Sequence, residues 1–391
     1  MATMTDPLRG KAAVVGAALH YYKRGTSPDS ERKLVLRAIV DACADAGVAP
    51  TELDGFCSFG DDHHSGPHLV GALGTHELRW CSMVWGGGGG GLVGAIESAA
   101  MAIATGQATT VVVYRGLAER DSGRQGAAVS RGHLNAHFLA PGIISPAQIC
   151  ALRSQRMIER DGVPESCMRA LVSACYFHAR GNPGAQGFAN TFDAGVYEDA
   201  RWISEPFGLY DCSRENDGAG AIVLVAADRA KDLAKKPVYL LAAAQGGGQG
   251  WGDVWENHPD YGSAGYKPLA KRLWQRSGLN PSDVDVLQVY ENFSGQAVAS
   301  IIDHGFCSVE EAGEYLTFEN LVAPGGRIPT NTAGGNLGEG FVHGIGLAIE
   351  TVRQLRGESS NPVPGAQTCL LVGGPGTPLN STAVFGTADT L

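Results

Sequence analysis

The chain has 391 residues, enough for two or three average domains or for two similar halves. Only 18% of its residues are charged and its net charge is −10, so it lacks the basic surface that a nucleic-acid-binding protein needs. No apolar run approaches the roughly 18 residues of a membrane span, and the first residues do not resemble a signal peptide. We therefore expect a cytoplasmic protein that binds neither nucleic acid nor membrane.

The nine cysteines form an odd set without any Cys-x-x-Cys pair, which argues against a disulfide framework or a zinc ribbon. The 55 glycines indicate a backbone packed closely on other backbone, as in an oligomer with a large interior.

The first third of the chain alternates between strand and helix patterns. Residues 11–18 and 55–59 are predicted strands, and residues 31–46 are an amphipathic helix that ends at Gly47. A run of six glycines at 86–91 then leads into a predicted helix at 94–105 and a β-branched strand at 109–114.

The glycine run opens a helix, so its backbone N–H groups and the positive end of the helix dipole are accessible. It lacks the Lys-Ser/Thr pair of a nucleotide-binding P-loop. A flexible linker is the alternative, but the regular helix and strand patterns that follow argue against it. The run suits an anion or a developing oxyanion.

Residues 115–205 form a long insertion rich in Gly, His, Arg and Pro, with an amphipathic helix at 146–161. Insertions of this length often build a loop domain that covers the substrate. A strand at 217–225 closes the first half, and residues 230–236 form a linker.

The second half repeats the first. Residues 46–54 (Ala-Gly-Val-Ala-Pro-Thr-Glu-Leu-Asp) reappear as residues 277–285 (Ser-Gly-Leu-Asn-Pro-Ser-Asp-Val-Asp), and the strand at 237–244 corresponds to the one at 11–18. A second glycine-rich segment at 334–344 leads into a helix through Leu355 and a strand at 369–372. The chain is an internal duplication whose halves should pack about a pseudo-twofold axis with both glycine-to-helix units at the centre.

This pattern resembles the thiolase superfamily, specifically the sterol-carrier-type thiolases and their relatives. The resemblance covers essentially the whole chain and rests on the duplication, on residues 213–225 with their Asp-Gly-Ala-Gly-Ala, on residues 289–293 and on residues 334–357. It implies a thiolase-like α/β fold in which two βαβαβ-type halves form αβαβα layers. The halves are residues 1–114 with 206–230, and residues 237–391; residues 115–205 are the inserted loop domain.

The catalytic positions of that family have changed together. Residues 86–91, all glycine, stand where the family has its acyl-accepting cysteine. The family's His-Asp-Cys-Phe is here Tyr290-Glu291-Asn292-Phe293, its Gly-His-Pro is residues 340–342 with His343 following, and its late Cys-x-Gly-Gly is residues 371–374. Without the thiolate, acyl transfer through a covalent thioester is excluded.

Among thiolase relatives, the chain most resembles the steroid side-chain-cleaving aldolases, which also have a glycine-rich run in place of the cysteine. The resemblance implies retro-aldol cleavage of a steroid β-hydroxyacyl-CoA into a 17-ketosteroid and a short acyl-CoA, propionyl-CoA or acetyl-CoA. It implies a homodimeric core, a small acyl-CoA-binding partner with an OB fold and a zinc ribbon, and no cofactor beyond the CoA of the substrate.

The candidate site follows from these motif positions. Tyr290 and His343 are the candidate acid–base residues, and Tyr114 is the reserve because Phe341 stands where relatives tend to have a second tyrosine. We expect neighbouring charges and helix N-termini to lower the pKa of Tyr290. The candidate substrate-binding residues are Gly88, Gly89, Gly90, Asn292, Phe341 and Gly374.

Other interpretations stay open. A tyrosine at a strand end often only packs, and a histidine at a helix start often only bonds neighbouring carbonyls. The cluster Asp61-Asp62-His63-His64 with His68 is more readily a chance gathering in a polar loop than a metal site. For the whole chain, the alternatives are a non-catalytic acyl-CoA-binding subunit and an acyltransferase with an unusual nucleophile.

Overall fold

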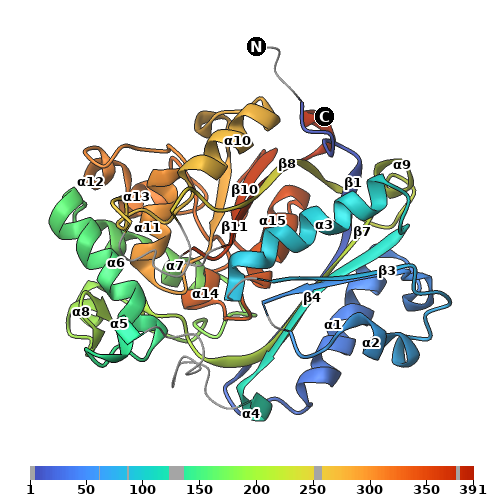
Figure 1. Ribbon diagram of the computed structural model, residues 1–391, viewed down its shortest axis with the longest axis horizontal. Coiled ribbons are helices and arrows are strands. Elements are labelled where there is room, and N and C mark those ends of the chain that lie inside the picture. Colours follow the sequence, from blue (N-terminus) through green and yellow to red (C-terminus); the bar gives the residue numbers. More distant parts are fainter. Residues whose placement is uncertain (1–4, 61, 86–87, 123–135, 251–257, 376–378) are drawn as a thin grey trace.

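The computed structural model describes residues 5–60, 62–85, 88–122, 136–250, 258–375 and 379–391. Within these residues, nine strands form one mixed sheet in the order β3-β2-β4-β7-β1-β8-β11-β10-β9 (Figure 1). Strands β3 to β1 in this order belong to the first half of the chain, and β8 to β9 belong to the second. Their bounds are β1 Ala12–Lys23, β2 Gly55–Phe59, β3 Trp80–Val84, β4 Thr110–Ala118, β7 Asn216–Ala226, β8 Val238–Gly246, β9 Val286–Val289, β10 Thr368–Val372 and β11 Asn380–Gly386.

The helices form three layers around these strands. Helices α3 and α15 each contact strands of both halves and lie together at the centre, whereas α1 covers β1, β4 and β7 on one outer side and α10 covers β8 and β11 on the other (Figure 1). The longer described helices are α1 Glu31–Ala46, α2 Gly66–Leu73, α3 Leu92–Ala104, α6 Pro146–Asp161, α7 Ser166–Gly181, α10 Lys267–Ser277, α11 Ser294–Asp303 and α15 Ile345–Arg356. The shorter ones are α4 Glu119–Ser122, α5 Ala136–Leu139, α8 Ala194–Glu198, α9 Ala227–Ala230, α12 Ala312–Tyr315, α13 Phe318–Leu321 and α14 Gly335–Gly338.

Alternating side chains of the strands divide the core in two. On β4, Val111 and Val113 pack into the cluster around α3 and α15, while Val112 and Tyr114 pack into the cluster beneath α1. A strand buried on both faces shows a continuous apolar sequence, which is what residues 111–114 have. The thiolase-like layering is therefore confirmed.

The duplication is visible in matching local structures. Helices α1 and α10 both end at a left-handed glycine, Gly47 with φ 73° and Gly278 with φ 69°, as the absence of a Cβ permits. The repeated Pro-x-acid segment forms a 3-10 turn in each half. After each turn an aspartate accepts backbone N–H groups at the start of a strand: Asp54 from Thr110, and Asp285 from Thr368.

The structure differs from the sequence-based expectation in three respects. The strands of the two halves are joined edge to edge, because Ala13 pairs with Tyr239 and Val14 with Val238, so they form one continuous sheet. Strand β4 continues to Ala118, beyond the expected boundary at 114, because its last residues pair with β7. Strands β3 and β11 were not anticipated; β3 is a half-exposed edge strand of mixed composition.

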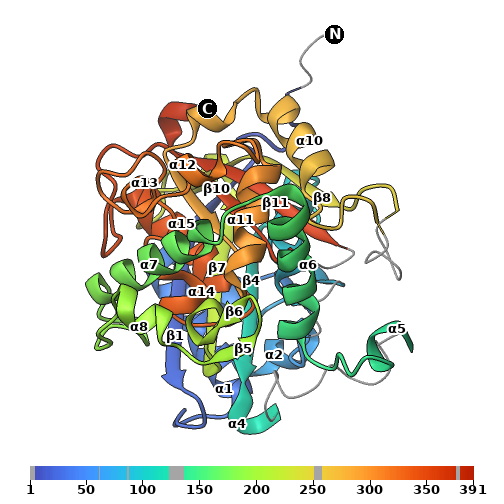
Figure 2. The same ribbon diagram turned by 90° about the vertical axis from the view of Figure 1, so that its left-hand side faces the viewer.

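The insertion packs on the second half of the chain. Helices α6 and α7 contact α11, and α7 also contacts α13 and α14 (Figure 2). The predicted helix at 146–161 is confirmed as α6, which begins with a Ser145 cap and a proline in its first turn. The expected boundary at 205 separates β5 (Trp202–Ser204) from β6 (Phe207–Gly208), which pair as a hairpin. No helix in the described ranges is both long and apolar enough to cross a bilayer.

Candidate active site

The glycine run lies at the start of α3, where both halves meet. Gly88 to Gly91 form a 3-10 turn, while Gly86 and Gly87 lie outside the described residues. The second half holds this turn by its backbone: Gly374 N–H donates to Gly89 O at 2.8 Å, and the Ser381 hydroxyl donates to Gly90 O at 2.6 Å. The second-half helix starts nearby, since a Cβ built on Gly344 would lie 3.2 Å from Leu92 Cδ2. The predicted meeting of the two glycine-to-helix units is confirmed.

Tyr290 follows β9 directly and lies against the glycine run. Its side chain is buried, and its backbone N–H donates to Val372 O at 3.1 Å. A Cβ built on Gly89 would lie 2.0 Å from Tyr290 Cε2, far inside contact distance. Gly89 is therefore required to make room for the tyrosine ring.

His343 borders the same space as the Tyr290 hydroxyl. A Cβ built on Gly88 would lie 3.7 Å from Tyr290 Oη and 3.9 Å from His343 Nε2, so both atoms lie beside Gly88. His343 has a left-handed backbone, φ 46°, and is followed by Gly344 with φ 82°. A non-glycine residue in this region carries strain of about 1 kcal/mol, which is typical of functional sites.

Arg115 of β4 contacts the other side of the imidazole. Arg115 Nε donates to His343 Nδ1 at 3.0 Å. The rest of the guanidinium is held by the Asp62 carboxylate at 2.8 Å and by the carbonyls of Gly60 at 2.8 Å and Gly116 at 2.7 Å. Arg115 and Asp62 are both buried. The contacts given above for the guanidinium nitrogens are all hydrogen bonds of ordinary length.

Burial sets the charge state of the two candidate acid–base residues. It raises the pKa of Tyr290, and the nearby Glu291 raises it further, although the Gly89 N–H and Arg115 act in the opposite direction. Burial also lowers the pKa of His343 well below its ordinary value, and the positive Arg115 adds to this effect. The expectation of a lowered tyrosine pKa is wrong, because desolvation outweighs the favourable charges. At neutral pH the site holds a phenol and a neutral imidazole.

Phe341 packs against both of these groups. Its ring centroid is 6.2 Å from that of Tyr290 and 5.3 Å from that of His343, in edge-to-face arrangements. Its backbone N–H donates to the Asn216 side-chain oxygen at 2.6 Å. The residue thus borders the candidate site as expected, but its apolar ring carries no exchangeable proton.

Glu291 is fully buried behind Tyr290. Its carboxylate accepts hydrogen bonds from Asn336 Nδ2 at 3.0 Å and from the Leu337 N–H at 3.4 Å. Burial nevertheless raises the pKa of Glu291 to about 8. At neutral pH most Glu291 carboxyls are therefore protonated, which reduces their unfavourable effect on the neighbouring phenol.

Tyr114 and Asn292 make other contacts and are not seen to join Tyr290 and His343 beside Gly88. Tyr114 points to the opposite face of β4 from Arg115, and its hydroxyl donates to His64 O at 2.5 Å. Asn292 accepts the Ser213 N–H at its backbone oxygen, 2.8 Å, and the Phe293 N–H at its side chain, 3.1 Å. The Tyr114 hydroxyl is a structural contact, and Asn292 joins the end of β9 to the segment after the insertion.

The residues of the His/Asp cluster have separate partners. Asp62 binds Arg115, the Nδ1 of His63 and the Nε2 of His64 lie 3.7 and 3.3 Å from Glu31 Oε1, and His68 bonds Ser65. Asp61 lies outside the described residues. Within the described part of the chain, no group of three or more His, Cys, Asp or Glu side chains is arranged to hold a metal ion.

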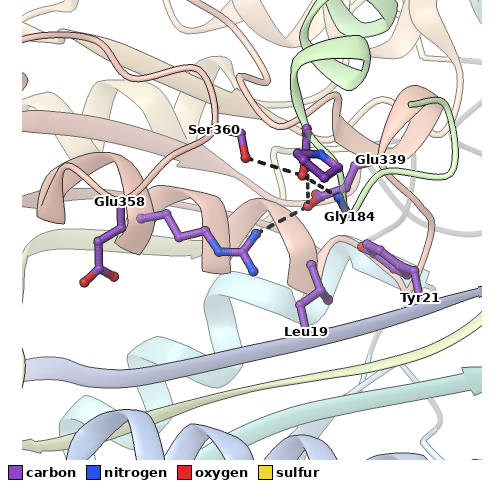
Figure 3. Close-up of a pocket in the computed structure, with 9 residues that line it drawn as sticks. Leu19, Tyr21, Gly184, Glu339, Glu358 and Ser360 are labelled. Atoms are coloured by element: carbon purple, nitrogen blue, oxygen red, sulfur yellow. Dashed lines mark hydrogen bonds and ion pairs between the residues drawn. The ribbon is translucent and has the colours of Figure 1, made fainter. Parts of the chain in front are cut away.

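A separate polar pocket of about 370 Å³ is lined in part by Tyr21, Glu339 and Arg353 (Figure 3). Glu339 forms one wall, where its carboxylate accepts from Asn182 at 3.2 Å and from Arg353 at 3.5 Å. Neither Tyr290 nor His343 lines this cavity. Burial raises the pKa of Glu339 to about 8, so a strongly shifted pKa is not confined to the candidate active site.

Sequence reasoning underestimated Arg115 and did not assign Asp62 a role at the site. A signal was present, because an arginine that follows the apolar run Val111–Tyr114 in a buried strand must be paired. The identity of its partners, one of them 228 positions away in the chain, could not be read from local patterns.

Comparisons with known proteins identify the family. The family model described as Thiolase C-terminal domain-like matches residues 249–387. A 17-hydroxy-3-oxo-4-pregnene-20-carboxyl-CoA lyase of Mycobacterium tuberculosis is 36% identical over 386 residues, which cover 95% of this chain and 98% of the relative. A steroid side-chain-cleaving aldolase of Thermomonospora curvata is 34% identical over 386 residues, with 95% and 97% covered.

Solved structures show the same relationship. The structure described as the Ltp2-ChsH2(DUF35) aldolase superposes with a TM-score of 0.90 at 34% identity, over 98% of this chain and 100% of that chain. Human mitochondrial 3-ketoacyl-CoA thiolase superposes with a TM-score of 0.69 at 14% identity, over 97% and 99%, and supports the fold alone. The chain belongs to the thiolase superfamily and, within it, to the family of the steroid side-chain-cleaving aldolases.

Proposed function

We propose that this protein is a carbon–carbon lyase that cleaves a steroid β-hydroxyacyl-CoA by a retro-aldol reaction. The products are a 17-ketosteroid and a short acyl-CoA, either propionyl-CoA or acetyl-CoA. The names of its relatives, a pregnene carboxyl-CoA lyase and a steroid side-chain-cleaving aldolase, support the substrate class. The observation that carries the proposal is the meeting of a neutral phenol and a neutral imidazole beside Gly88, within contact distance of the position that a Cβ of this glycine would occupy.

Tyr290 is the proposed proton shuttle. The reaction moves one proton from the β-hydroxyl of the substrate to its α-carbon while the bond between the two carbons breaks. A neutral phenol can accept the first proton at its oxygen and give its own to the α-carbon, so no net charge is created on the side chain. The raised pKa of Tyr290 keeps the phenol protonated at neutral pH, so the side chain enters the reaction with the proton that it gives to the α-carbon.

Negative charge also develops on the thioester oxygen as the carbon–carbon bond breaks. Hydrogen-bond donors that are already in place stabilise such an oxygen at no cost of reorganisation during the reaction. His343 borders the space opposite Tyr290 and is the proposed partner of this oxygen. The remaining candidate substrate-binding residues, Gly90, Phe341 and Gly374, form the surroundings of these two groups; Asn292 is retained as a candidate for contact with the acyl chain.

Cysteine chemistry has little support at this site. Cys150 contributes to the electrostatic environment of Tyr290, but burial raises the pKa of its thiol to about 12. Burial likewise raises the pKa of Cys81 on β3. Because a thiolate is the nucleophile in acyl transfer, a protonated thiol does not favour an acyltransferase. The proposed steps use CoA only as part of the substrate.

The proposed assembly has two kinds of contact. Strand β3 pairs with β2 on one edge and, among the described strands, with none on the other, and the neighbouring Trp85 and Leu78 are 75% and 37% exposed. Such an edge favours a homodimer of the thiolase type. The relative described with a DUF35 component supports a small acyl-CoA-binding partner, for which we propose an OB fold and a zinc ribbon.

The test is an assay of the purified protein, with and without a DUF35 partner, on the CoA thioester of a 17-hydroxysteroid side chain. We expect the ketosteroid and the short acyl-CoA in equal amounts by liquid chromatography and mass spectrometry. Tight binding without turnover would favour the non-catalytic subunit. An acylated protein detected by intact-mass analysis would favour the acyltransferase.

A further inference from the structure

We propose that Arg115 is a positioning residue that holds His343 in the tautomer with its proton on Nε2. His343 then serves the reaction as a hydrogen-bond donor and not as a base. This inference rests on the proposed function of the site, which it deepens by assigning one role to each of the two facing side chains.

The first argument is the direction of the hydrogen bond. A guanidinium group has five N–H donors and no acceptor, so the contact of 3.0 Å between Arg115 Nε and His343 Nδ1 requires a lone pair on Nδ1. In a neutral imidazole the proton is then on Nε2, the nitrogen that lies 3.9 Å from the position of a Cβ on Gly88, next to the Tyr290 hydroxyl. By bonding Nδ1, Arg115 thus determines that Nε2 is the ring atom that can donate a hydrogen bond to the substrate.

The second argument is that the guanidinium has no freedom to turn away. Its two terminal nitrogens bond the Asp62 carboxylate and the carbonyls of Gly60 and Gly116, at 2.7 to 2.8 Å. Asp62 is itself held by the Gly116 N–H at 3.1 Å. Contacts from β4 and from the loop after β2 therefore fix the Nε–H toward Nδ1, and breaking this buried network would leave charges unpaired.

The third argument is electrostatic. Protonation of Nδ1 would place two N–H donors face to face and add a positive charge beside a buried positive charge. Among the described residues, the ring also contacts the Phe341 side chain, and its Nε2 lies beside Gly88 together with the Tyr290 hydroxyl. The nearby Asp62 already binds the arginine. The lowered pKa of His343 agrees with this arrangement.

Tyr290 and His343 consequently have different roles in the reaction. Tyr290 can both accept and donate a proton, whereas Nε2–H of His343 can only donate a hydrogen bond unless the ring changes tautomer. The thioester oxygen needs a donor, and the β-hydroxyl needs a group that takes its proton. The geometry assigns the oxygen to His343 and the hydroxyl to Tyr290.

The first experiment reads the tautomer directly. Long-range proton–nitrogen NMR spectra of ¹⁵N-histidine-labelled protein, with the His343 signals assigned from their loss in His343→Ala, should show a bare Nδ1 and a protonated Nε2 at pH 7. This measurement needs no substrate, so it stands even if the proposed function fails. A proton on Nδ1, or on both nitrogens, would overturn the proposal.

The second experiment separates a donor from a base. In His343→Gln the amide can accept from Arg115 with its oxygen and donate to the substrate with its NH₂, but it cannot take up a proton. We expect His343→Gln to retain turnover within about tenfold of the parent, and His343→Ala to lose about 10²-fold to 10³-fold, the usual loss for one such donor. Equal losses in the two variants would contradict the donor role.

The third experiment tests Arg115 itself. The double variant Asp62→Asn/Arg115→Met removes both buried charges together, so that neither is left alone. We expect a mixture of His343 tautomers in the NMR spectra and a fall in kcat of about 10-fold to 10²-fold with KM changed less than threefold. The matched control is Arg356→Met. It removes an arginine of α15 whose buried side chain binds Asp45 of α1 at 2.7 Å. A double variant that keeps the single tautomer, or that loses no more activity than the control, would overturn the role of Arg115.

Discussion

Replacement of Tyr290 by phenylalanine tests the proposed proton shuttle with the least disturbance of packing. The ring keeps its contacts with Gly89 and Phe341, and the change removes only the phenol oxygen. Because burial keeps the group neutral, no buried charge is lost. Removal of the buried phenol oxygen should change the unfolding free energy by only about 1 kcal/mol. In a chain of this size that corresponds to a change in Tm of only about 2 °C.

The effect on turnover should be far larger. General acid–base catalysis contributes about 10²-fold to 10⁴-fold, or about 2.7 to 5.4 kcal/mol of transition-state stabilisation. We therefore expect Tyr290→Phe to lower kcat and kcat/KM by that factor with little change in KM, measured as release of the ketosteroid with the partner present. Tyr114→Phe is the matched control, because this buried tyrosine lies on the other face of β4 and should stay within threefold of the parent. If Tyr290→Phe also stays within threefold, the shuttle role is refuted.

Three further predictions concern the surroundings of the site and the assembly. Gly89→Ala places a methyl group 2.0 Å from the Tyr290 ring, so it should abolish turnover and lower the unfolding free energy by about 1 to 3 kcal/mol, measured by thermal unfolding and by ketosteroid release. The control is Gly71→Ala on an open face of α2, which should be neutral or slightly stabilising in both measurements. The pKa of Glu291 is raised from its ordinary 4.5 to about 8, so the stability gained from its protonated form is fully present below pH 4.5 and is lost as the pH rises through 8. Glu291→Gln should therefore lose less unfolding free energy than the parent between pH 5 and pH 8 in urea titrations, and an unchanged pH dependence would argue against the buried acid. Cys81→Lys, on the exposed edge strand β3, should weaken the homodimer by about tenfold or more in analytical ultracentrifugation, whereas an unaltered dimer would locate the interface elsewhere.

Local patterns in the sequence were sufficient for most of the fold. Hydrophobic periodicity predicted α1, α6 and β2 with the bounds that the structure has, because each has a regular buried face and clear terminating residues. The duplication was readable because Gly47 and Gly278 end equivalent helices, and a turn and an aspartate follow in both halves. Strand β3 escaped because an edge strand has neither a continuous apolar run nor a strict alternation.

The motif positions also identified the family and the residues that meet at the centre. The loss of the cysteine and the replacement of histidine by Tyr290 are facts of sequence, and they are sufficient to exclude thiolate chemistry. Gly89 and Phe341 lie beside Tyr290, and Gly374 contacts Gly89. The choice of Tyr114 as reserve could have been narrowed, since successive residues of a strand point to opposite faces and only one of Tyr114 and Arg115 can face the centre.

Other properties of the site depend on tertiary structure alone. The contact of Arg115 with His343 joins residues 228 positions apart, and no local pattern encodes such a pairing. The sign of the Tyr290 pKa shift is decided by the balance between desolvation and nearby charges, which requires the buried environment to be known. The sequence by itself determined which chemical groups are available and that acyl transfer through a cysteine thiolate is excluded. The packing of the two halves determined that Tyr290 and His343 are neutral and that the Nε2 of His343 lies beside Tyr290. It also determined that Tyr114 points away from them, because burial and orientation arise only when distant segments meet.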